Sequence, residues 1–308
     1  MDVGRYAPSP TGDLHLGNAR TALIAWLWAR HAGGRFLLRF EDLDRARVRP
    51  GCAQAQADSL AWLGLDWDGA PVAQSQRGEL YDAAFAALAE CGVLYECFCS
   101  RADVRRAASA PHGPDGPLYG GVCRDLSQSE REARLALGRA PALRVRMESE
   151  VEFCDDLAGP QRELLEETTG DIVLRRSDGV VAYQLAVVVD DAAQGVTHVV
   201  RGADLLASTA RQIRLYELLG LAPVPAYAHV PLLLGGDGER LAKRHGAVGL
   251  TELREGGADP RAIVGRLAYS AGLLERPEPC APASLVESLE PGALERHATR
   301  IDPAALRW

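Results

Sequence analysis

The sequence lacks a long apolar run. No segment holds the roughly 20 consecutive apolar residues that a transmembrane helix needs. The first ten residues, MDVGRYAPSP, show no apolar stretch behind a basic one, as a secretory signal would require. We therefore expect no membrane segment and no signal peptide, and predict a cytoplasmic protein.

A disulfide framework is also lacking. The cysteines number seven in 308 residues, an odd and sparse set that does not fit a disulfide-stapled domain. Apolar residues make up 47% of the chain and charged residues 25%, as in an ordinary globular protein with a full core. The net charge of −8 argues against indiscriminate binding of polyanions, although a local basic face can still bind phosphates because salt screens charges beyond about 10 Å.

What is present at the N-terminus predicts a βαβ unit. Residues 3–7 have a strand pattern, and the following Pro- and Gly-containing residues form a loop. From Asn18 the apolar residues recur at steps of three and four until Gly33 and Gly34, and residues 35–40 are a compact apolar strand. This order favours a parallel, doubly wound sheet. Further predictions are helices at 54–65, 79–91 and 204–219, strands at 197–200 and 229–234, and a hairpin at 172–183.

Two short motifs carry phosphate chemistry. HLGN at residues 15–18 lies between a strand and a helix, where the helix N-terminus favours phosphate. Gly17 allows close approach to the backbone, and His15 can donate to charge that develops during nucleotidyl transfer. RLAKR at residues 240–244 follows a glycine-rich loop and could neutralise a triphosphate. Taken alone, each motif has a structural alternative: a histidine that shapes a turn, or a solvated basic turn.

Five motifs, in order, resemble the catalytic domain of glutamyl-tRNA synthetases, a class I aminoacyl-tRNA synthetase family. They are YAPSPTG at 6–12, HLGN at 15–18, RFEDLD at 39–44, THVVRGADLL at 197–206 and RLAKR at 240–244. The second and the last correspond to the family's HIGH and KMSKS signatures. The resemblance implies an α/β fold: a class I, Rossmann-like, doubly wound parallel sheet with an inserted zinc-knuckle subdomain and a short helical C-terminal appendage.

The resemblance also implies roles by position. Arg5 is expected to hold the side-chain carboxylate of glutamate, and Glu41 its α-ammonium group. His15 and Lys243 are expected to be catalytic, and with Mg²⁺ they would stabilise the charge that spreads as ATP reacts. The further glutamate positions are Tyr6, Ala7, Pro8, Ser9, Tyr183 and Arg201. The ATP positions are His15, Gly17, Asn18, Arg240, Leu241, Ala242, Lys243 and Arg244.

Some positions depart from the family or have a second interpretation. Asn18 replaces the second histidine of HIGH, and Ala242 replaces the serine of KMSKS. An asparagine can still donate a hydrogen bond, and Lys243 is kept, so activity is expected. Without the resemblance, Tyr183 would be interpreted as a half-buried strand tyrosine and Arg201 as part of a surface ion pair.

The residues after the basic loop indicate a branch of the family. Residues 245–308 are too few for the helical anticodon-binding domain of a full glutamyl-tRNA synthetase. The shortened arrangement resembles the glutamyl-queuosine tRNA(Asp) synthetases, which place glutamate on the queuosine base of the anticodon. The partners it implies are ATP, L-glutamate and tRNA(Asp) carrying queuosine, and a monomer is expected. A short enzyme charging a tRNA 3′ end and a non-catalytic RNA-binding paralogue remain alternatives.

A cysteine cluster supports the same branch. Cys97, Cys99 and Cys123, together with Tyr119, resemble a zinc knuckle in which a tyrosine oxygen is the fourth ligand. Three thiolates and one oxygen can complete a closed tetrahedral Zn²⁺ site. His112 is an alternative fourth ligand, and three free buried thiols are the alternative to a metal. We predict a catalytic domain at 1–95 and 172–245, an inserted subdomain at 96–171 and a helical region at 246–308.

Overall fold

The computed structural model of the chain describes residues 1–100, 102–104, 118–235, 249–294 and 296–300. The predicted ATP residues Arg240, Leu241, Ala242, Lys243 and Arg244 lie outside this part, and so does His112. Within it, no helix combines the length and the apolar character needed to cross a membrane.

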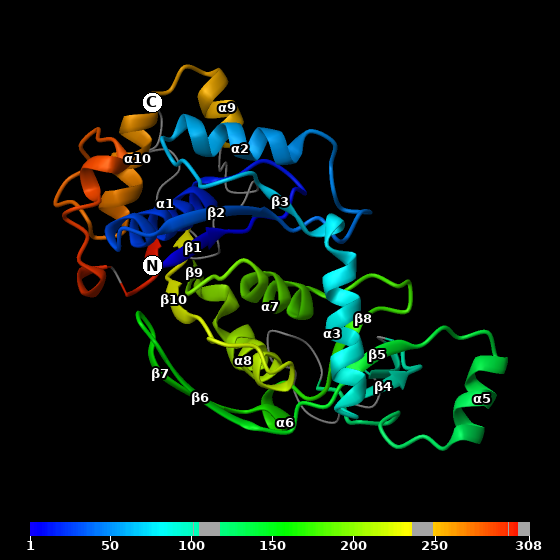
Figure 1. Cartoon of the computed structure of the whole chain (residues 1–308). Helices are drawn as coiled ribbons and strands as arrows, with labels where there is room; N and C mark the ends of the chain where they lie inside the picture. The colour runs from blue at the N-terminus through cyan, green and yellow to red at the C-terminus, as the bar shows by residue number, and fades with distance from the viewer. Residues whose placement is uncertain (101, 105–117, 236–248, 295, 301–308) are drawn as a thin grey trace.

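A mostly parallel central sheet, made of a three-stranded and a four-stranded ladder that lie side by side, forms the centre of the molecule (Figure 1). Strand β1 (Val3–Tyr6) pairs with β2 (Arg35–Phe40), and β2 pairs with β3 (Val72–Ala73). On the other side, β9 (His198–Gly202) pairs with β10 (Ala226–Val230), which pairs with β6 (Glu150–Asp155). The Thr197 amide donates to the Val3 carbonyl at 2.9 Å, which places β9 beside β1. The chain order therefore reverses between β1 and β9, and such a switch point leaves a crevice at the carboxyl ends of the strands.

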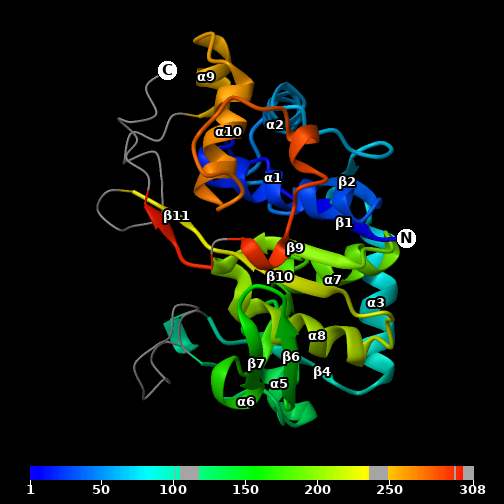
Figure 2. The same cartoon turned by 90° about the vertical axis from the view of Figure 1, so that its left-hand side faces the viewer.

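Helices cover both faces of this sheet, as Figure 2 shows. On one face lie α1 (Leu16–His31), α2 (Cys52–Trp62), α9 (Leu250–Glu255) and α10 (Pro260–Ser270), and on the other α3 (Gly78–Glu90), α7 (Tyr183–Ala193) and α8 (Thr209–Leu218). Strand residues alternate between two cores: Phe36 and Leu38 pack with α1, whereas Leu37 packs with α3 and α7. Burial on both faces explains why β2 is a continuous apolar run apart from its arginines.

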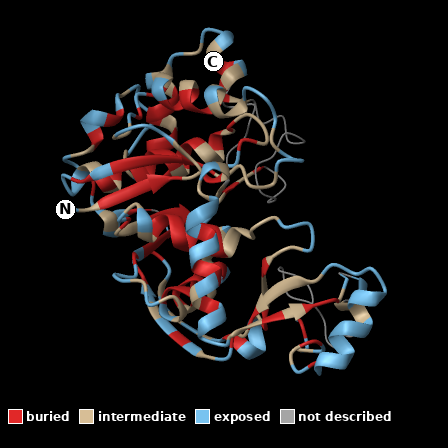
Figure 3. Ribbon diagram, turned by 45° about the vertical axis from the view of Figure 1, so that its right-hand side comes forward, coloured by how far each residue is buried: buried red, intermediate tan, exposed pale blue. Residues whose placement is uncertain are grey.

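Two sheets contain strands from both sides of the domain limits predicted at residues 95/96 and 171/172. The division into domains remains a prediction. β8 (Ile172–Arg175) joins β4 (Leu94–Cys97) and β5 (Ala142–Val145) in an antiparallel sheet. This sheet and α5 (Gln128–Ala136) form one end of the molecule, where α5 has no buried residue (Figure 3). In contrast, β6 and its antiparallel partner β7 (Gly159–Leu164) extend the central sheet. The remaining elements include α6 (Leu165–Thr168), β11 (Leu233–Leu234) and β12 (Thr299–Arg300).

Three local predictions need correction. The predicted hairpin forms between residues 172 and 182, where Val181 bridges to Arg175 and the Ala182 amide donates to the Leu174 carbonyl at 2.8 Å, but Tyr183 begins helix α7 instead of ending a strand. The reason is tertiary: the valine-rich run after Tyr183 is buried all along α7 between β-strands and helices. The predicted helix at 204–219 is a 3-10 helix, η2 (Ala203–Ser208), followed by α8. The predicted strand at 229–234 is split into β10 and β11 around Pro231, which has no N–H to donate to a ladder.

Candidate active site

A cavity of about 770 Å³ opens at the switch point of the sheet. Its wall contains all the described residues predicted for glutamate: Arg5, Tyr6, Ala7, Pro8, Ser9, Glu41, Tyr183 and Arg201. The described residues predicted for ATP, His15, Gly17 and Asn18, line the same cavity. The fold thus brings Arg5 and Arg201, which are 196 positions apart in the sequence, into one cavity wall. Their roles in binding remain predictions.

The loop after β1 is fixed from two sides. The Glu41 amide donates to the Pro8 carbonyl at 3.0 Å, which ties this loop to the end of β2. From α2, the buried side chain of Gln56 donates to the carbonyls of Ser9 (3.1 Å) and Gly12 (2.8 Å). A loop with its carbonyls held in this way presents a defined backbone surface to a ligand.

His15 caps the helix that follows. Its Nδ1 accepts from the amides of Gly17 (3.1 Å) and Asn18 (3.4 Å), so the neutral ring carries its proton on Nε2. The Asn18 side-chain oxygen accepts in turn from the His15 amide at 3.2 Å, which completes a capping box. The departure at Asn18 therefore has a structural role. A Cβ at position 17 would lie 3.0 Å from the His15 ring, so a larger residue there would displace the imidazole from its capping position.

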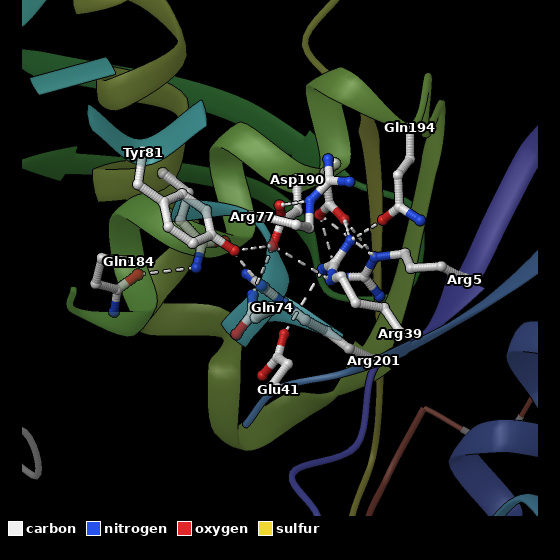
Figure 4. A network of polar contacts seen from close by, with 12 residues as sticks. Arg5, Arg39, Glu41, Gln74, Arg77, Tyr81, Gln184, Asp190, Gln194 and Arg201 are labelled. Atoms are coloured by element: carbon white, nitrogen blue, oxygen red, sulfur yellow. Dashed lines mark hydrogen bonds and ion pairs between the residues drawn. The ribbon is translucent and has the colours of Figure 1, made fainter. Parts of the chain in front are cut away.

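Beneath the cavity lies a buried network of arginines and carboxylates (Figure 4). Asp191 of α7 accepts from Arg5 Nε at 3.2 Å and from Arg39 Nη1 at 2.7 Å. Burial alone would raise the pKa of Asp191, but Arg39 and Arg5 hold it below its ordinary value. Asp190 accepts from Gln74 and Tyr81, both at 2.8 Å, and pairs with Arg77. The side chains of α7 thus bind both β1 and β2.

This network limits what Arg5 can offer to a ligand. Its Nε and Nη2 both contact the Asp191 carboxylate, at 3.2–3.3 Å. Its Nη1 has no hydrogen-bond partner among the described residues. A substrate carboxylate therefore cannot form a bidentate pair with the Nε–Nη2 edge of Arg5 and has access to the Nη1 side.

Glu41 lies at the boundary between the network and the cavity. Its Oε1 is 3.6 Å from Arg39 Nη2, and the side chain is 10% exposed. Burial raises the pKa of Glu41 to about 7, although Arg39 and Arg5 act in the opposite direction. A nearly buried carboxylate that is loosely paired can accept a cationic group such as an ammonium.

Tyr183 and Arg201 complete this wall. The Tyr183 hydroxyl has no hydrogen-bond partner among the described residues, and burial raises the pKa of this phenol. Arg201 is 5% exposed and is held from several sides by internal acceptors, so it is not a surface arginine. Sequence reasoning missed Asp190 and Asp191; the available signal was a pair of adjacent aspartates directly after a buried valine run.

The cysteine cluster lies in a small separate core, with Tyr95 and Phe98. The Sγ atoms of Cys97, Cys99 and Cys123 lie within 4.8 Å of one another, and Cys97 Sγ is 3.4 Å from the Tyr119 hydroxyl. In a tetrahedral zinc site with Zn–S bonds of about 2.3 Å, two sulfurs are about 3.8 Å apart. The separation of 3.6 Å between Cys99 and Cys123 fits this geometry, so the cluster could hold a metal ion.

Two cations lie against this cluster. Arg134 Nη1 donates to Cys123 Sγ at 3.0 Å, and the Arg144 guanidinium lies over the Tyr119 ring, 3.9 Å from its centroid. Burial would raise the pKa of the Cys123 thiol, but hydrogen bonds from the Phe98 amide and Tyr119 hold it below its ordinary value. These surroundings favour the thiolate form of Cys123, the form that binds metals, whereas burial raises the pKa of the Cys99 thiol to about 12.

Comparison with known proteins defines the class. Residues 3–273 match the family described as tRNA synthetases class I (E and Q), catalytic domain, and the chain therefore belongs to this family. The chain is 55% identical to a Glutamyl-Q tRNA(Asp) synthetase of Symbiobacterium thermophilum, covering 98% of this chain and 96% of the relative. It is 56% identical to that of Nocardia farcinica, with 96% and 91% covered. A Glutamate–tRNA ligase of Oleidesulfovibrio alaskensis is 43% identical over 99% of this chain, but only 65% of the ligase is covered.

Solved structures agree with this family. The glutamate-tRNA synthetase of Elizabethkingia anophelis superposes with a TM-score of 0.86 at 26% identity, covering 100% of this chain and 69% of that chain. A glutamate tRNA ligase from Elizabethkingia meningosepticum, in complex with its amino acid, gives a TM-score of 0.85. The predicted class I, Rossmann-like fold and the predicted enzyme family are confirmed.

The pKa of Glu41 generates a prediction about substrate binding. Below about pH 7 this carboxyl is protonated and can no longer pair with an ammonium group. The KM for glutamate in ATP–pyrophosphate exchange should therefore rise as the pH falls from about 8 to about 6, where glutamate's own groups do not titrate. Glu41→Gln should raise this KM and abolish its pH dependence. The KM for ATP in the same reactions is the control, and an unchanged pH profile in Glu41→Gln would disprove the role.

Proposed function

We propose that this enzyme activates glutamate with ATP and transfers it to the queuosine base in the anticodon of tRNA(Asp). The observation that supports the proposal is the similarity to relatives of that name. Over almost its whole length the chain is 55% and 56% identical to the Glutamyl-Q tRNA(Asp) synthetases of Symbiobacterium and Nocardia. It is 43% identical to the Oleidesulfovibrio Glutamate–tRNA ligase over 99% of the chain.

The chemistry has two steps. The α-carboxylate of glutamate attacks the α-phosphorus of ATP, and pyrophosphate leaves. A hydroxyl of the queuosine ring then attacks the carbonyl of the mixed anhydride, and AMP leaves. Neither step needs a protein nucleophile, so most of the acceleration comes from positioning the reactants. Mg²⁺, when bound with ATP, would neutralise phosphate charge.

Each of the cavity residues would have a separate role in binding glutamate or ATP. Glu41 would bind the α-ammonium group, and Arg5 Nη1, Tyr183 and Arg201 would surround the side-chain carboxylate. The capping hydrogen bonds of His15 leave its proton on Nε2, where it can donate to the phosphates of ATP. Lys243 would act on the same phosphates. The enzyme would then discriminate glutamate from glutamine through the positive charge of its arginines.

The acceptor is tested by transfer assays. We expect labelled glutamate to become attached to tRNA(Asp) containing queuosine and not to the same tRNA without it. An anticodon stem-loop carrying queuosine should also be an acceptor, and the full-length product should keep its label after removal of the 3′ CCA end. Attachment only to the terminal adenosine would support a short glutamyl-tRNA synthetase. A lack of ATP–pyrophosphate exchange would support a non-catalytic paralogue.

The role of Lys243 can be tested chemically because it is the only lysine in the sequence. A reagent selective for ε-amines should modify Lys243 and stop ATP–pyrophosphate exchange, and Mg-ATP should protect against both effects. Peptide mass spectrometry separates this modification from one at the N-terminal amine. A Lys243→Arg variant should resist the loss of activity. Complete modification of Lys243 with normal exchange would exclude the role.

We also propose that the metal is Zn²⁺, held by Cys97, Cys99, Cys123 and Tyr119 as a closed structural site. Elemental analysis should find about one zinc per chain. Tyr119→Phe removes one ligand and should speed the loss of zinc to a chelator. Tyr95→Phe is a matched control, since Tyr95 lies in the same small core but hydrogen-bonds Asp171. Equal zinc retention in both variants would remove Tyr119 from the ligand set.

A further inference from the structure

Arg201 differs from Arg5 and Arg39 in having only neutral partners among the described residues. Its Nε donates to His229 Nε2 at 3.0 Å, and its Nη1 donates to Gln212 Oε1 at 2.7 Å. Its Nη2 donates to Thr209 Oγ1 at 3.0 Å and to the Leu205 carbonyl at 3.4 Å. Among the described residues, no carboxylate lies within 4.0 Å of this guanidinium. The side chain is thus fixed in place while its charge is not neutralised by direct contact.

A carboxylate lies one imidazole ring away. Asp155 Oδ2 accepts from His229 Nδ1 at 2.5 Å, and both side chains are fully buried. Asp155 Oδ1 also accepts from the amides of Leu157 (3.1 Å), Ala158 (2.8 Å) and His229 (3.1 Å). These backbone contacts fix the carboxylate at the turn that follows β6.

The arrangement selects one form of the histidine. Nε2 of His229 accepts from Arg201, so the ring must be neutral with its proton on Nδ1, where Asp155 accepts it. Burial, partly opposed by Asp155, lowers the pKa of His229, which agrees with a neutral ring. An aspartate that holds a histidine in one tautomer and orientation is a known means of positioning in enzymes.

We propose that His229 and Asp155 are positioning residues for the amino-acid substrate: they hold Arg201 in the cavity wall with its charge available to an anionic group of the substrate. The contrast with Arg5 and Arg39 supports this. Both of these contact Asp191 directly, and that ion pair satisfies much of their charge inside the protein. Separating Asp155 from Arg201 by a neutral ring keeps the guanidinium oriented and leaves its attraction for an anion largely intact.

The inference rests on the proposed activation of glutamate, and a pair of variants tests it. In His229→Asn the side-chain nitrogen corresponds to Nδ1, so the contact to Asp155 can persist while the contact to Arg201 is lost. In His229→Gln the side-chain oxygen corresponds to Nε2 and can still accept from Arg201, whereas the contact to Asp155 is lost. The two variants thus separate the two halves of the chain Asp155–His229–Arg201.

We expect His229→Asn to raise the KM for glutamate about tenfold or more, the loss typical of a hydrogen bond to a charged group, with the KM for ATP nearly unchanged. His229→Gln should show a clearly smaller rise. The increase in melting temperature that glutamate causes without ATP should be lost in His229→Asn and partly kept in His229→Gln. This second readout needs no turnover.

A purely structural role predicts a different outcome. Both variants would then lower the melting temperature, with an unchanged KM for glutamate or with equal rises in both KM values, and the inference would be wrong. If His229→Asn does not fold, a normal KM for glutamate in Asp155→Asn would likewise overturn it, and a selective rise would support it. Absence of glutamate-dependent exchange in the wild-type enzyme would instead contradict the proposed function.

Discussion

The shared contact of Arg5 and Arg39 with Asp191 is the interaction on which the site depends. Asp191 belongs to α7, whereas the two arginines lie on β1 and β2, more than 150 residues earlier in the chain. Arg39 is fully buried and Arg5 is 4% exposed, so both cations need anions from within the protein. Removing one partner of such a pair typically costs about 3–5 kcal/mol. Ion pairs between β1, β2 and α7 therefore stabilise the floor of the cavity. They allow this floor to consist of polar side chains.

The arginines of the site show that residue type alone does not determine a role. Arg39 contacts Asp190, Asp191 and Glu41 and has no exposed side-chain surface, so its function is to hold the wall. Arg5 contacts Asp191 through Nε and Nη2, and its Nη1 has no hydrogen-bond partner among the described residues. Arg201 has no carboxylate in contact among the described residues. The three side chains thus form a graded series, from complete to absent internal neutralisation, and this grading separates structural cations from those that can attract a ligand.

The sequence predicted the first βαβ unit well because each of its signals is local. The helix periodicity before Gly33, the apolar run of β2 and the turn residues after Tyr6 all lie within forty residues. The residues of the cavity wall were predicted from the resemblance of ordered motifs to a known family. Such motifs identify residues of a site, but they do not show which other residues these contact. The Asp191 network could not be predicted, because its members meet only when α7 crosses beneath β1 and β2. The start of α7 at Tyr183 was missed because the valine run that follows fits a buried strand as well as a buried helix.

The β6–β7 hairpin has a consequence for how this protein can be divided or recombined. It lies within the predicted insertion, yet β6 pairs with β10 and carries Asp155 at its end. The segment between the two halves of the catalytic-domain fold therefore cannot be removed as an independent unit. Exchanging residues 96–171 between relatives would also exchange an edge of the central sheet and the carboxylate behind His229. A chimera made at those boundaries would take the carboxylate that contacts His229, and through it Arg201, from the donor, although no described residue of the exchanged segment lines the cavity.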